Sequence, residues 1–108
     1  MNCIPESDWK LLRQMEPEKL ALACERILSR AALITQNRKG KEHEAFLKLW
    51  REVNDGNKEI ANMFDDIRRS TAIFKLLAWR TNGLLSDEEL SKFSPPTREF
   101  LERFQNLR

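Results

Sequence analysis

The chain has 108 residues and a formal net charge of +2, set by 19 basic and 17 acidic side chains. That length is typical of one domain, so we expect a single domain over residues 1–108. The near-balanced charge excludes a broad electrostatic surface of the kind that grips phosphate backbones. Tyrosine is absent, glycine occurs three times, and β-branched residues are scattered, a composition that disfavours sheets. The composition therefore predicts an all-α protein.

The N-terminal segment and the two cysteines indicate the compartment. Glu6, Asp8 and Lys10 precede any apolar run, which argues against a secretory signal. No apolar run approaches the roughly 20 residues needed to span a bilayer. Cys3 and Cys24 have neither metal-ligand spacing nor the density of a disulfide framework, so we expect reduced thiols. These features predict a cytoplasmic protein without a membrane segment.

Prolines, glycines and capping residues divide the chain into six predicted helices. They cover about 8–15, 17–38, 41–53, 57–81, 86–93 and 94–107. Pro17 suits the first turn of the second helix, because its missing N–H has no intrahelical partner there. The expected architecture is a small bundle of about five to six helices, in which the two long helices, 17–38 and 57–81, pack lengthwise.

The segment from Asn54 to Asn57 leaves two interpretations open. Its sequence, Asn-Asp-Gly-Asn, has poor helix propensity at each position and predicts a turn between the third and fourth helices. The seam of residues facing one way nevertheless continues through it in alternating steps of four and three, which is a heptad pattern. This seam comprises Phe46, Trp50, Val53, Asn57, Ile60, Phe64, Ile67, Thr71, Phe74 and Ala78. It would favour one continuous helix from about 41 to 81 and would strengthen the case for a dimer.

The C-terminal third carries the clearest local signals. Asn82 and Gly83 are expected to end the fourth helix. Ser86 and Glu89 are spaced as the two members of a capping box, which marks the start of a short fifth helix. Pro95 then opens the last helix. The apolar positions of that helix are Phe100, Leu101, Phe104 and Leu107.

The segment 72–79 is the feature that points most directly to a function. Seven of its eight residues are apolar, so on a helix they cover every face and require burial on all sides. A chain this small has little cover to offer, which favours a second copy as the partner. The expected interface residues are Ile73, Leu76, Leu77 and Trp79. In the alternative interpretation, the C-terminal helices cover the segment within one chain.

No catalytic residue, metal ligand or cofactor site is predicted. His43 is the only histidine, and its neighbours Glu42 and Glu44 point to other sides of a helix, so the three cannot converge on a metal. Asp65 is placed to form a surface pair with Arg69 four residues later. The chain is therefore expected not to be an enzyme.

Two functions from different classes follow from these patterns. The favoured one is a non-enzymatic helical interaction or assembly module that forms a homodimer through the 72–79 segment, with a further protein partner possible. The alternative is a nucleic-acid-associated regulator that uses the basic region 26–41. The basic residues of that region are Arg26, Arg30, Arg38, Lys39 and Lys41. Nearby glutamates dilute this patch and no helix-turn-helix spacing accompanies it, so nucleic acid is the less favoured partner.

Overall fold

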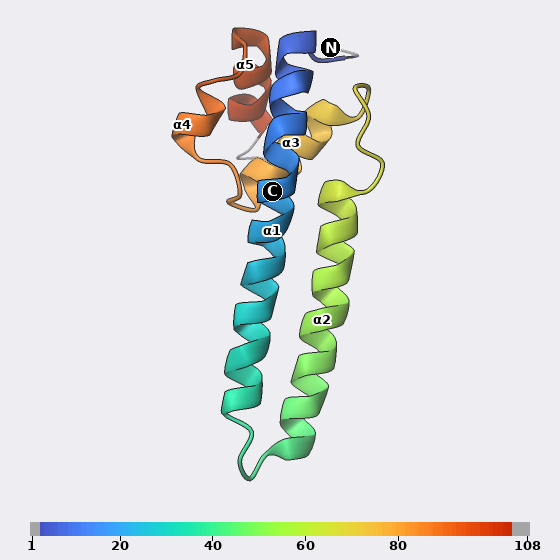
Figure 1. The fold of residues 1–108 in the computed structure, drawn as a ribbon, viewed down its shortest axis with the longest axis vertical. Coiled ribbons are helices and arrows are strands. Elements are labelled where there is room, and N and C mark those ends of the chain that lie inside the picture. Colours follow the sequence, from blue (N-terminus) through green and yellow to red (C-terminus); the bar gives the residue numbers. More distant parts are fainter. Residues whose placement is uncertain (1–2, 105–108) are drawn as a thin grey trace.

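The protein is all-α, and the computed structural model describes residues 3–104 (Figure 1). Its five helices are α1 (Glu6–Gln36), α2 (Glu42–Phe64), α3 (Ala72–Thr81), α4 (Asp87–Leu90) and α5 (Pro95–Phe104). No strand occurs in the described range. The prediction of an all-α bundle built on two long helices is confirmed, although the helices begin and end at other residues than expected.

The molecule is elongated, with extents of 54 × 24 × 21 Å. The helices α1 and α2 form an antiparallel hairpin, and α3, α4 and α5 gather around the N-terminal part of α1 (Figure 1). We call the projecting part of the hairpin, residues 24–60, the arm. The remaining described residues, 3–23 and 61–104, form the head.

The helices predicted at 8–15 and 17–38 are one helix, because α1 runs through Pro17. An interior proline costs a helix about 3 kcal/mol, since it removes one hydrogen bond and crowds the preceding turn. Here α1 is held on both sides of Pro17, by buried Leu12 before it and by buried Lys19 and Ala23 after it. Tertiary packing therefore outweighs the local preference to end the helix.

The predicted turn at 54–57 is also wrong, because α2 continues through it. Gly56 is buried against α1, and a Cβ atom built on it would lie 2.7 Å from Cδ1 of Ile27. The glycine thus lets the two helices approach closely at this level. The packing of α1 against α2 compensates for the poor helix propensity of the segment.

Both versions of the predicted long C-terminal helix, 57–81 and 41–81, are wrong because α2 ends at Phe64. Residues 65–71 form a turn in which Asp66 adopts a left-handed conformation with φ of 57°. The hydroxyl of Thr71 closes this turn by donating to the carbonyl oxygen of Asp66 at 2.7 Å and accepting from the N–H of Arg68 at 2.9 Å. The heptad spacing continues across the turn, but the helix does not.

The turn allows α3 to fold back into the head. The indole N–H of Trp79 donates to the carbonyl oxygen of Met63 at 3.1 Å, near the end of α2, and its ring lies 5.5 Å from the ring of Phe64. This hydrogen bond satisfies one of the last carbonyl groups of α2, which lack partners inside their own helix. The end of α2 and the position of α3 are thereby coupled.

The core lies entirely in the head. Its buried hydrophobic residues are Ile4, Leu12, Ala23, Met63, Ala72, Ile73, Leu76, Trp79, Leu84, Leu85, Leu90, Phe93 and Leu101.

Side-chain hydrogen bonds start the short helix α4 and hold α5 to α1. The predicted capping box opens α4: the N–H of Glu89 donates to Oγ of Ser86, and the carboxylate of Glu89 accepts from the N–H of Ser86. At α5, the buried carboxylate of Asp8 accepts from the N–H and hydroxyl of Ser94 and from the hydroxyl of Thr97. The last apolar position predicted for α5, Leu107, lies outside the described residues.

Candidate interaction surface

The predicted interface in the 72–79 segment is buried inside the chain. Ile73, Leu76 and Trp79 are 2%, 0% and 0% exposed, and Leu77 is half-buried. The cover comes from α1, α2 and α5, which all pack on α3, and from the loop residues Leu84 and Leu85. The prediction that these residues form a surface for a partner is therefore wrong. The alternative, closure of the core by the C-terminal helices, describes this segment.

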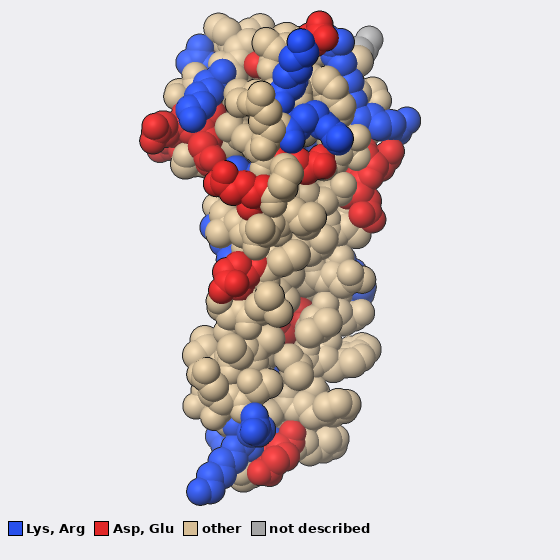
Figure 2. All heavy atoms as spheres, in the orientation of Figure 1, with Lys and Arg blue, Asp and Glu red and all other residues tan. Residues whose placement is uncertain are grey.

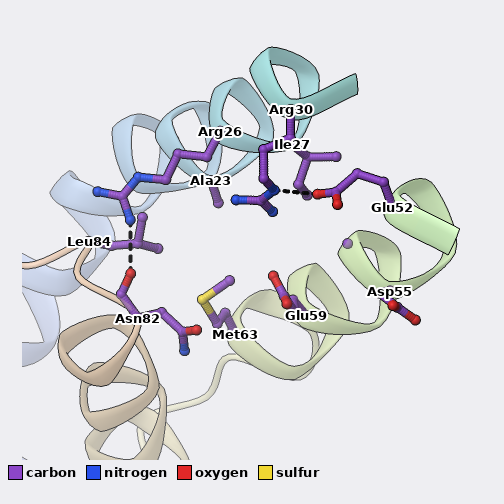
Figure 3. Close-up of a pocket in the computed structure, with 11 residues that line it drawn as sticks. Ala23, Arg26, Ile27, Arg30, Glu52, Asp55, Glu59, Met63, Asn82 and Leu84 are labelled. Carbon is purple, nitrogen blue, oxygen red and sulfur yellow. Dashed lines mark hydrogen bonds and ion pairs between the residues drawn. The ribbon is translucent and has the colours of Figure 1, made fainter. Parts of the chain in front are cut away.

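The predicted basic patch does not form one surface. Arg26 donates to the carbonyl oxygens of Asn82 and Gly83 at 2.8 and 2.9 Å, just beyond the end of α3. A cation there neutralises the negative end of the α3 dipole. Arg30 pairs with Glu52 across the hairpin. Two of the five basic residues are thus engaged in holding the fold together (Figure 3).

The other three basic residues lie near the far end of the arm, around the connection between α1 and α2. The guanidinium of Arg38 donates to the carbonyl oxygen of Thr35 at 2.9 Å. Glu42 opens α2 there, and hydrogen bonds from the backbone N–H groups of Glu42 and Gly40 lower the pKa of its carboxyl. This end of the arm therefore carries both signs of charge.

A groove of about 380 Å³ lies on one side of the hairpin where the arm meets the head, and Ala23, Met63, Asn82 and Leu84 of the head help to line it (Figure 3). Arg26 and Arg30 line it from α1, and Glu52, Asp55 and Glu59 line it from α2. The carboxylate of Glu59 points into the groove, whereas that of Asp55 points away from it. This mixture of charges gives the groove no strong preference for an anion or a cation.

The opposite side of the hairpin is uncharged between the head and the tip, where Glu42 begins α2. On a helical wheel with 100° per residue, we place Ile27 of α1 and Gly56 of α2 at 0°, because these two residues are in contact. The charged groove residues of both helices then lie at negative angles. A second set of residues lies at positive angles of about 40° to 120°. Because the two helices are antiparallel, positive angles on both of them face the same side of the hairpin, opposite the groove. We call it the arm face; it comprises Cys24, Leu28, Ala31 and Thr35 of α1 and Phe46, Trp50, Val53, Asn57 and Ile60 of α2.

The arm face is largely open. Leu28, Phe46, Trp50 and Val53 are 63%, 63%, 61% and 52% exposed. In the space-filling view the arm shows few charged side chains between the head and the far tip (Figure 2). Contiguous exposed apolar surface of this kind marks an interaction site in most proteins that carry it.

The arm also lacks a core of its own. No residue from 24 to 55 is buried, whereas every buried hydrophobic residue lies in 4–23 or 63–101.

The accessible surface of the chain is 7252 Å², against about 6,300 Å² for a typical monomer of this mass. The radius of gyration is 16.6 Å, against about 13 Å for a compact domain of this length. The excess surface, about 1,000 Å², is close to the 800 Å² that each partner buries in a standard interface.

The α2 part of the arm face could be predicted from the sequence. The heptad seam named Phe46, Trp50, Val53, Asn57 and Ile60, and these residues do lie on one side of a continuous helix. Spacing alone could not show that α1 packs beside this seam rather than on it. The seam is left open because Gly56, which is not part of it, makes the contact with α1.

In residues 3–104, no three His, Cys, Asp or Glu side chains gather in a way that could hold a metal ion. Within the same range, no helix has the length and apolar character required to cross a bilayer. Neither a protein-family model, nor a curated protein, nor a solved structure matches the chain.

Proposed function

We propose that the protein is a non-enzymatic helical assembly module that pairs with a second copy of itself through the arm face. The observation that carries the proposal is that an uncharged, exposed side runs along an arm in which no residue from 24 to 55 is buried. Most of the stability of a helix comes from packing its apolar side, so an arm without a core gains greatly from a partner.

A second copy fits this surface because the surface is self-complementary. The α1 part carries small side chains, among them Cys24, Ala31 and Thr35, whereas the α2 part carries the large rings of Phe46 and Trp50. Each copy therefore offers large side chains on α2 and, on α1, a shallow surface that can receive the large side chains of the other copy. Interfaces built in this way resemble a domain core divided between two chains.

The aromatic side chains are expected to supply most of the binding free energy. Tryptophan is among the commonest residues whose replacement weakens an interface by 2 kcal/mol or more. Trp50 is 61% exposed in the single chain, so its burial in a dimer would remove a large apolar area from water.

Sedimentation equilibrium of the wild-type chain and of Trp50→Glu tests the proposal. The wild type is expected to be a dimer at micromolar concentration, and Trp50→Glu is expected to raise its dissociation constant at least about 30-fold. Leu47→Glu is the matched control, because Leu47 is 41% exposed on the same helix but points away from the arm face. Circular dichroism should show all three proteins equally helical at high concentration.

Three results would contradict the proposal. The wild type could remain monomeric at several hundred micromolar, or the two glutamate variants could weaken the dimer equally. The third is a monomeric wild type that sediments with phosphatidylcholine–phosphatidylserine vesicles through Trp50, which would assign the arm face to a lipid surface instead.

A further inference from the structure

The two halves of the arm face differ in side-chain size, and this difference restricts how two copies can fit together. Closed dimers have a twofold axis, and two faces of this shape can meet around such an axis in two ways. With the axis along the arms, each α2 lies on the partner's α1 and both tips point the same way. With the axis across the arms, α1 lies on the partner's α1, α2 lies on the partner's α2, and the tips point in opposite directions.

We infer that the axis runs along the arms, so that the dimer is a four-helix bundle with both heads at the same end. This inference rests on the proposed self-association and assigns its geometry. In this arrangement Trp50 is level with the small residues Ala31 and Thr35 of the partner's α1, and Leu28 is level with the smaller Val53 and Asn57, so the layers of the bundle have similar volumes. In the other arrangement the rings would meet each other while Ala31 faced its own copy, leaving cavities that destabilise an apolar interface.

The heights of residues along the hairpin give a second argument. Ile27 is level with Gly56, and Arg30 with Glu52, because each pair is in contact. An axis along the arms preserves these heights, so Glu25 comes level with the partner's Lys58. By the same count, Glu25 turns about 160° and Lys58 about 200° from the contact, so both point outward from the hairpin and lie along one edge of the bundle, where their opposite charges attract each other weakly. With the axis across the arms, Glu25 would instead lie along an edge formed by two copies of α1.

The position of the head permits the parallel arrangement. The buried residues by which α1 holds the head are Asp8, Leu12, Lys19 and Ala23. Counted from Ile27 at 100° per residue, all of them turn to the groove side of α1. The head consequently packs behind the arm face, and two heads at the same end do not block the contact.

Disulfide trapping between two different variants tests the inference. Leu28 and Asn57 both point directly out of the arm face at nearly the same height, and both are exposed, so cysteine is tolerated at either. In a background that carries Cys3→Ser and Cys24→Ala, the mixture of Leu28→Cys with Asn57→Cys should yield several-fold more linked dimer than either variant alone. Linked product from either variant alone, exceeding that from the mixture, would overturn the arrangement.

A distance measurement keeps the test decisive if trapping is inefficient. Spin labels at position 10, introduced by Lys10→Cys on the same background, should lie within about 25 Å of each other, as expected across one bundle of helices spaced 8–10 Å apart. With the axis across the arms they would be separated by roughly 60 Å, given 1.5 Å per residue. A dimer with the long distance overturns the parallel arrangement alone, whereas the absence of any dimer overturns the proposed function.

Discussion

Gly56 is the residue at which local and tertiary preferences conflict most clearly. As a glycine inside a helix it costs roughly 1 kcal/mol relative to alanine, and two asparagines and an aspartate surround it. Its lack of a side chain lets Ile27 occupy the space beside it, with all three outer carbon atoms of Ile27 within 3.2 Å of where a Cβ would lie. The residue weakens its own helix and strengthens the pair of helices.

The conflict predicts a reversal of sign in a double-mutant cycle. In the wild-type background, Gly56→Ala should destabilise the protein by about 1 kcal/mol, because overpacking of 1–3 kcal/mol exceeds the gain in helix propensity. In an Ile27→Ala background the clash is gone, and the same substitution should stabilise the protein by a few tenths to 1 kcal/mol. Urea denaturation of the four proteins measures both values, and equal effects of Gly56→Ala in the two backgrounds would contradict the assigned contact.

The elements of the head are fastened to α1 by buried polar groups. The ammonium group of Lys19, almost fully buried on α1, lies 2.6 Å from the carboxylate of Glu89 in α4. Partial burial raises the pKa of Glu89, but the hydrogen bonds from Lys19 and Ser86 and the charge of Lys19 outweigh it, so the pKa lies below its ordinary value of 4.5. A four-residue helix is thereby tied to the longest helix of the protein.

This pairing predicts a defined dependence of stability on pH. Because folding lowers the pKa of Glu89, its contribution is complete above about pH 4.5 and is lost as the pH falls through the lower folded value. Glu89→Gln keeps the capping box but removes the charge, so it should lower stability at pH 7 and make the loss between pH 5 and pH 3 shallower.

Glu88→Gln is the matched control for that experiment, since Glu88 is an exposed neighbour that makes no contact with Lys19. Its free energy of unfolding, measured by urea denaturation from pH 7 to pH 3, should follow the wild-type curve. An acid limb that is equally steep in the wild type and in Glu89→Gln would show that the ion pair does not contribute to it.

Over the whole molecule, burial is distributed unevenly between the head and the arm. The head contains the entire buried core, and the arm contains none of it. Segments that bury few apolar groups open at low free-energy cost, independently of the rest of the fold. The head and the arm are therefore expected to differ in local stability.

Hydrogen exchange measures this difference and its link to assembly. In Trp50→Glu, amides of the arm between 28 and 53 should exchange at least about tenfold faster than in the wild type, because each 1.4 kcal/mol of lost protection is a factor of ten. Amides of α3 in the head should be unaffected. Arm protection that is the same in both proteins and independent of concentration would show that the arm is stable without a partner.

Several features of the protein follow from the sequence alone. The all-α class, the capping box at Ser86 and the helix that follows Ser94 are local properties, because they depend on residues within one or two turns of each other. The seam on α2 is of the same kind, since helical spacing places Phe46, Trp50 and Val53 on one side whatever packs nearby.

Tertiary structure decided which apolar residues became core and which became surface. Ile73, Leu76 and Trp79 were expected at an interface and are buried, while the heptad residues Phe46 and Trp50 are exposed. The helix boundaries differ from the predicted ones for the same reason. Contacts between residues distant in sequence allow α1 to continue through Pro17 and α2 to continue through Gly56, and α2 ends at Phe64, where α3 folds back. Periodicity specifies the direction in which a side chain points, but only the folded chain determines whether another helix lies there.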